Sequence, residues 1–196
     1  MLHYSDILRI IDIKLTALSC ALFCLGLFLS LWVVKKKLRI FLFFPLWIWR
    51  LVKRYLSPND HFLKIFLFIF FLNSISLFAN LVSGFLLGLP LIFAILLGIN
   101  IGIIILTETG RLDYIAIFLN PVSLFELPAA WISLSMGIKI SISLYPNFVF
   151  WSALQMFYKG LYVYFLVIIP LLIISGLIEA ALIKVFTKNQ FFSRVK

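Results

Sequence analysis

The sequence predicts an all-α, polytopic bundle of transmembrane helices that forms a single domain over residues 1–196. Hydrophobic residues make up 64% of the chain and charged residues only 12%, and the mean hydropathy is +1.18. Several apolar runs reach about 20 residues, the length that a helix needs to cross a bilayer. No stretch alternates with the two-residue period that a membrane-spanning strand requires.

The apolar runs define about five spans, at residues 15–34, 62–82, 89–106, 122–144 and 161–185. The first run is too long for a signal-peptide core and no small-residue cleavage site follows it, so we expect it to stay in the mature protein. Ser83-Gly84 and Gly88-Leu89-Pro90 mark a turn between the second and third spans. Phe148 to Lys159 is aromatic and partly polar, and we expect it at the membrane interface.

Residues 38–57 predict a basic helix that lies on the membrane surface. Arg39, Arg50, Lys53 and Arg54 bracket the run FLFFPLWIW, which has too few apolar residues to span and is interrupted by Pro45. The two tryptophans of this run favour the interface. A re-entrant hairpin is the alternative interpretation.

The net charge of +10 comes from lysines and arginines that cluster beside the spans. This placement indicates topology signals and contacts with anionic lipid headgroups of the bilayer, and we expect no binding of nucleic acid. With five spans, thirteen of the 17 lysines and arginines fall on one side and three on the other. The positive-inside rule therefore predicts a multi-pass protein of the cell membrane with its N-terminus outside and its C-terminus in the cytoplasm.

Four polar residues of different spans are expected to share one layer of the inner leaflet: Glu126, Glu179, Asn100 and Asn73. The first three lie about 6–10 Å from the cytoplasmic ends of their spans, at 1.5 Å of rise per residue, and Asn73 lies somewhat deeper. Because an acid without a partner is costly in hydrocarbon, we expect the two carboxyl groups to approach one another, with an asparagine completing the hydrogen bonds.

Each carboxylate also has a plainer interpretation. Ser123 and Glu126 have the capping-box spacing, in which Glu126 would accept a hydrogen bond from the Ser123 amide. Glu179 could extend toward the nearby interface. Lys139 lies on another face of its helix from Glu126, and we expect it to extend outward.

Small residues favour close helix packing in several places. These are the GxxxG pair of the third span, the face that Glu126 shares and a position near Glu179: Gly98, Gly102, Ala130, Ser133, Gly137 and Gly176. Such surfaces exceed what one five-helix bundle obviously needs. We therefore expect a homo-oligomer, in the simplest case a two-fold dimer.

Catalytic signatures are largely absent from the sequence. It has no HExxH, GxSxG or Walker motif and no metal-ligand cluster, and His3 and His61 fall outside the spans. Cys20 and Cys24 lie one helical turn apart and read as small packing residues. We expect neither an enzyme nor a metal or cofactor site.

Two motifs resemble the stage II sporulation protein M family. Its central Pro-His-Gly-x-Phe-Glu-x-Pro-Ala motif is matched by Pro121, Phe125, Glu126, Pro128 and Ala129. The late Pro-Leu-Leu…Ile-Glu-Ala motif is matched by Pro170, Leu171, Leu172, Ile178, Glu179 and Ala180. Val122 and Ser123 stand where the family has His and Gly, and Ile101 replaces the Gly after Asn100. The resemblance covers about residues 65 to 185.

The resemblance implies an integral membrane scaffold or an accessory subunit of a cell-envelope or membrane-remodelling complex. Founding members of the family belong to a complex that remodels the envelope during engulfment, in which partner proteins hydrolyse peptidoglycan. The alternative function is a small membrane transporter or channel that uses an intramembrane site at Glu126 and Glu179. An intramembrane enzyme is a distant third, because the chain offers no nucleophile or metal set.

Overall fold

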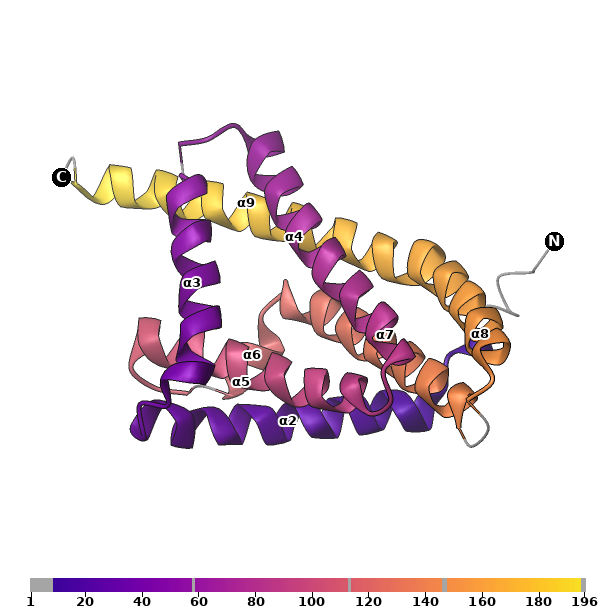
Figure 1. Ribbon diagram of the computed structural model, residues 1–196. Helices are drawn as coiled ribbons and strands as arrows, with labels where there is room; N and C mark the ends of the chain where they lie inside the picture. The colour runs from indigo at the N-terminus through magenta and orange to yellow at the C-terminus, as the bar shows by residue number, and fades with distance from the viewer. Residues whose placement is uncertain (1–8, 58, 113, 146–147, 195–196) are drawn as a thin grey trace.

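The computed structural model describes residues 9–57, 59–112, 114–145 and 148–194, with side chains outside 114–116 and 186–194, and every regular element in them is helical (Figure 1). Five helical segments are long and apolar enough to cross a membrane, which confirms the fold class. In chain order the elements are α2 (Ile13–Lys35), α3 (Arg39–Tyr55), α4 (Phe62–Val82), η1 (Ser83–Phe85), α5 (Leu89–Thr109), α6 (Tyr114–Leu119), α7 (Ser123–Leu144), α8 (Phe150–Val163), η2 (Tyr164–Ile168) and α9 (Ile169–Arg194).

The tightest helix pair is α2 with α5, and glycine makes it possible. A Cβ added at Gly98 would overlap the backbone oxygen of Phe23, and one added at Gly26 would overlap the backbone oxygen of Ile95. A Cβ at Gly102 would overlap the hydroxyl of Ser30. The GxxxG pair of α5 therefore packs against α2 of the same chain, as close approach of backbones in lipid requires.

Helix α7 is the centre of the bundle. It contacts α2, α4, α5, α8 and α9, and 67% of its membrane-length window is buried, against 28–33% for the other four spans. Ser133 donates a hydrogen bond to the backbone oxygen of Leu77, and Ser141 donates one of 2.9 Å to that of Gly84. A Cβ at Gly137 would lie 2.5 Å from the backbone oxygen of Asn80. The small face of α7 is thus held against α4 and η1.

Helix α3 crosses one end of the bundle, in a direction transverse to α2, in Figure 1. It packs on α5, where Leu42 and Leu46 join the cluster of Ile99 and Ile103. Pro45 is buried inside this helix, which continues through it to Tyr55, and residues 38–57 thus contain the single helix that the sequence predicted there. The tertiary contacts of α3 compensate for the one backbone hydrogen bond that a proline removes.

The last span is longer than expected. Helix α8 continues through a π-helical turn, η2, into α9, so that residues expected at the interface begin an apolar helical segment over Phe150–Val185. The N–H of Ile169 bonds the carbonyl of Tyr164, five residues back. This wider turn directly precedes Pro170, whose ring would clash with the carbonyl four residues earlier in a regular helix. A segment of 36 residues is about 54 Å long, so part of it must extend beyond a hydrocarbon core of about 30 Å.

Candidate functional site

The family motif forms the beginning of the central helix. Asn120 accepts a hydrogen bond of 3.0 Å from the N–H of Val122 through its side-chain oxygen, which shapes the entry to α7. Val122 is the N-cap residue and no side chain caps the helix, so the capping box of Ser123 and Glu126 does not form. Glu126 lies in the first turn, where the partial positive charge of a helix N-terminus favours a carboxylate.

Glu126 and Glu179 lie close enough for their charges to interact. Helices α7 and α9 are in contact, and Ala129 and Ala130 share one buried cluster with Ile168 and Leu172. Both carboxylate side chains are half-buried, and no hydrogen bond joins either of them to another described residue. The two acids therefore interact electrostatically, and no hydrogen bond between their carboxyl groups is seen among the described contacts, so their direct approach stays a prediction.

Four buried polar atoms have no hydrogen-bond partner among the described residues. One is the hydroxyl of Ser175, which is fully buried and lies one turn before Glu179 on the face of α9 that carries Leu172. The others are the Ser74 hydroxyl, the Asn80 side-chain nitrogen and the Trp131 indole nitrogen, which belong to other helices. Each such atom costs about 1–3 kcal/mol, so the interior of the bundle is not optimised for stability alone.

The two asparagines predicted for the polar layer do not complete it. Asn73 on α4 and Asn100 on α5 are half-buried, and the structure gives neither a hydrogen bond to Glu126 or Glu179. The sequence analysis missed Asn80, which is buried, and Tyr164, whose hydroxyl donates a hydrogen bond of 2.7 Å to the backbone oxygen of Ser74. The spacing of seven between Asn73 and Asn80 places both near one face of α4, which was the available signal for Asn80.

The remaining motif residues surround this layer without entering its polar contacts. Ala129 is buried against the α8–α9 segment, while Phe125 and Pro128 are half-buried and Pro121 and Pro170 are exposed. Pro128 lies inside α7. Among the described residues no group of three or more His, Cys, Asp or Glu side chains could hold a metal ion.

The packing residues are all used within one chain. Gly98 and Gly102 pack on α2; Ala130, Ser133 and Gly137 belong to the buried face of α7; and Gly176 packs on the ring of Phe66 at 3.3 Å from an added Cβ. These faces are therefore occupied within the chain and no longer support a homo-oligomer. The oligomeric state itself stays a prediction.

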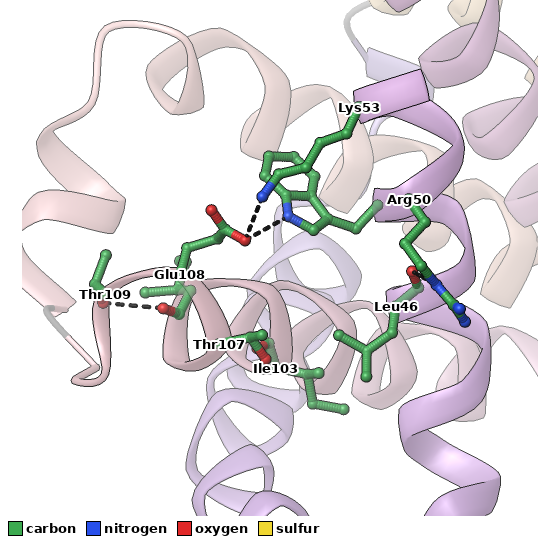
Figure 2. A network of polar contacts seen from close by, with 9 residues as sticks. Leu46, Arg50, Lys53, Ile103, Thr107, Glu108 and Thr109 are labelled. Carbon is green, nitrogen blue, oxygen red and sulfur yellow. Dashed lines mark hydrogen bonds and ion pairs between the residues drawn. The ribbon is translucent and has the colours of Figure 1, made fainter. Parts of the chain in front are cut away.

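A second polar cluster, not anticipated from the sequence, joins α3 to the end of α5 (Figure 2). Trp49 and Lys53 both donate hydrogen bonds of 2.7 Å to one carboxylate oxygen of Glu108. The Lys53 ammonium also lies 5.1 Å from the centre of the Trp49 ring. The predicted third span ends at residue 106, before Glu108, but α5 continues to Thr109 and ends at Gly110, whose φ of 71° suits a glycine.

Lys139 also differs from expectation. Its ammonium donates a hydrogen bond of 2.6 Å to the backbone oxygen of Ile10, in the segment that precedes α2. The side chain is half-buried and ties that segment to α7, so it does not extend freely outward.

The comparisons with known proteins agree with the motifs. No curated protein and no solved structure matches the chain. The family model described as stage II sporulation protein M matches residues 19–182, which adds α2 and α3 to the region that the motifs cover. The match includes most of the 196 residues and all five candidate spans in whole or in large part. The chain therefore belongs to the stage II sporulation protein M family, whose sequence pattern here forms a multi-pass helical membrane protein.

Proposed function

We propose that this protein is a membrane scaffold or an accessory subunit of a cell-envelope or membrane-remodelling complex, without catalytic chemistry of its own. One observation carries the proposal. The central helix α7 is 67% buried over its membrane-length window, whereas the windows of the other four spans are only 28–33% buried. A rigid centre with broad apolar outer faces suits a protein that holds other membrane proteins beside it.

The proposal includes an orientation, with the N-terminus outside and the C-terminus in the cytoplasm. The beginning of α2 and the end of α9 lie at opposite ends of the bundle (Figure 1). Helix α3, with its exposed Arg39, Arg50 and Arg54, follows the end of α2. The positive-inside rule favours the cytoplasm for that end.

Site-specific photocrosslinking in the native membrane tests the scaffold role. A photoreactive amino acid is placed at exposed positions on four different helices: Leu31, Ile75, Ile92 and Leu177. Leu134, which is fully buried in α7, is the matched control. We expect adducts with another membrane protein from one or two adjacent helices and none from Leu134. Adducts with lipid alone at every exposed position would contradict the proposal.

A second function, passage of protons or monovalent cations, is favoured by one specific observation. The carboxylates of Glu126 and Glu179 interact, and Ser175, whose buried hydroxyl has no hydrogen-bond partner in the described chain, lies one helical turn before Glu179. Oxygen ligands of this kind suit small hard cations and protons. Proteoliposomes containing the wild-type chain or Glu126→Gln would show flux that the variant loses if this function holds. Equal leakage of both would support the scaffold role.

A further inference from the structure

One side of helix α3 contacts α5, whereas most residues on its other side are exposed, and Tyr55 near its end stacks on Phe68 of α4. Leu42, Leu46 and the Trp49–Lys53 pair face α5, through the cluster of Ile99 and Ile103 and the carboxylate of Glu108. These contacts fix the rotation of α3 about its own axis. The exposed side of α3 is therefore held in a defined direction and is not free to rotate.

The face opposite to α5 is an exposed apolar row. Ile40, Phe43, Phe44 and Trp47 follow a spacing of three and four, and their side chains are 87%, 68%, 56% and 46% exposed. Large apolar side chains in such a row are typical of an interfacial helix whose apolar side is immersed among acyl chains. A tryptophan at the end of the row suits the headgroup boundary.

Three exposed arginines flank this row along the helix. Arg39 lies at its start, and Arg50 and Arg54 follow Phe43 and Trp47 at the same spacing of three and four. Arg50 and Arg54 are one turn apart, whereas Arg39 lies eleven positions before Arg50, about 16 Å along the helix. The Nε of Arg50 donates a hydrogen bond of 3.2 Å to the backbone oxygen of Leu46, which holds its guanidinium along the helix.

Among the described residues, no acidic group is paired with these arginines. The sequence of α3 contains no Asp or Glu. The carboxylate of Glu108 is paired with Lys53 at 2.7 Å, and that of Asp60 is paired with Lys64 at 2.8 Å. Three like charges therefore flank an apolar row, at the end of the bundle where α2 and α5 end.

We propose that α3 is a binding site for anionic phospholipids, in which Arg39, Arg50 and Arg54 hold phosphate headgroups while Phe43, Phe44 and Trp47 pack against the acyl chains. Guanidinium groups bind phosphate oxygens through paired hydrogen bonds, which an ammonium cannot reproduce. A basic residue near an anionic surface contributes about 1 kcal/mol, which corresponds to about fivefold in affinity per arginine. The site does not depend on the scaffold role and could exist in a transporter equally well.

The test uses the full chain, purified in an uncharged detergent. Phosphatidylglycerol or phosphatidylcholine with the same acyl chains is titrated, and bound lipid is measured by native mass spectrometry, with the Tm followed in parallel. We expect tight adducts and a rise in Tm with phosphatidylglycerol only. The triple variant Arg39→Gln, Arg50→Gln and Arg54→Gln should bind this lipid at least tenfold more weakly. The reduction should be smaller than the product of three separate effects, because neighbouring sites are not additive.

Two further variants keep the test decisive. Arg111→Gln removes one positive charge from an exposed position just beyond α5, as each of the three arginine changes does on α3, and should leave the lipid preference unchanged. Replacing the three arginines with lysine retains the charge and should preserve most of the preference for phosphatidylglycerol. This lysine variant also keeps the proposal testable if the glutamine variant does not fold. Equal binding of both lipids by the wild type, or an equal loss in Arg111→Gln, would overturn the proposal. Binding of an acidic peptide in place of phosphatidylglycerol would also overturn it and assign the face to a protein partner.

Discussion

The α2–α5 contact and the α7–α9 contact are both built from small residues in a membrane, yet they treat polar atoms differently. Between α2 and α5, Gly26, Gly98 and Gly102 bring the backbones together, and the Ser30 hydroxyl is satisfied by Leu27 of its own helix at 2.6 Å. Between α7 and α9, Ala129 and Ala130 pack on Leu172, but Glu126, Glu179 and Ser175 make no hydrogen bonds within the described chain. The first contact is therefore devoted to stability, whereas the second retains polar groups that packing does not explain.

The largest expected effect comes from Gly98→Ala. The new Cβ would overlap the backbone oxygen of Phe23 and lie 2.8 Å from the backbone nitrogen of Leu27, neither of which can move without separating the helices. We expect a loss of about 3 kcal/mol or more in the free energy of unfolding, at the upper end for overpacking. Reversible unfolding in mixed micelles measures it.

Gly176→Ala is the matched control for that prediction. Its Cβ would lie 3.3 Å from the Phe66 ring, which can shift by a few tenths of an ångström, and in ordinary contact with the Cβ of Phe70 at 3.9 Å. Because alanine is favoured over glycine in a helix by about 1 kcal/mol, we expect a change near zero or a small gain. Equal losses in the two variants would show that backbone approach is not what distinguishes the α2–α5 contact.

Two buried serines provide a second matched pair. Both are fully buried, but Ser133 donates to the Leu77 carbonyl while Ser175 has no partner in the described chain. Ser133→Ala should lower the free energy of unfolding by about 0.6–1.7 kcal/mol, the range for interhelical hydrogen bonds in membranes. Ser175→Ala should change it little or raise it, because an unpaired hydroxyl is removed. A loss in Ser175→Ala as large as that in Ser133→Ala would contradict the difference between the two contacts.

The carboxylate of Glu126 is expected to matter less for folding than the small residues around it. No hydrogen bond within the described chain is lost in Glu126→Gln or Glu126→Leu, and its electrostatic interaction is with another acid, Glu179. We expect both variants to remain folded, with Tm values within about 4 °C of the wild type, since a stability cost below about 1 kcal/mol gives a shift of that order. A collapse of Tm in the Leu variant together with retention in the Gln variant would instead indicate a structural hydrogen bond.

The smallest expected effect is that of Glu108→Gln, outside both contacts. Its partner Lys53 is about half exposed, and exposed ion pairs contribute about 0.2–1 kcal/mol, less at high salt. The global Tm should barely change, whereas amide exchange in α3 should become faster as the helix separates more often from α5. Thr107→Ala on the same helix end, whose hydroxyl bonds only the Ile103 carbonyl at 2.7 Å, is the control and should leave α3 unaffected.

The polar layer shows which contacts can be predicted from the depth of a residue along its span. Counting 1.5 Å per residue from the span ends brought Glu126 and Glu179 to one level, and the structure places them within range of each other. The same count brought in Asn73 and Asn100, to which the structure gives no hydrogen bond with either acid. Depth is one coordinate, and the direction in which a side chain points around its helix depends on how the helices are rotated in the bundle.

The sequence by itself determined the membrane class, the approximate spans, the basic helix α3 and the family motifs, because each is encoded in local composition and spacing. Apolar run length decides insertion whatever the neighbours are, and a glycine or proline marks a turn without reference to the rest of the chain. These features survive any arrangement of the helices.

Only the tertiary structure decided which helices pair. In the structure Gly98 and Gly102 pack on α2 of the same chain, whereas the sequence was equally compatible with packing on a second copy of the protein. The structure also shows the hydrogen bonds of Lys139 with Ile10 and of Glu108 with Trp49 and Lys53. The physical reason is that lipid does not discriminate between apolar faces, so helix partners are selected by shape and by a few hydrogen bonds. Those depend on positions 55 to 129 residues apart in the sequence, which no local pattern records.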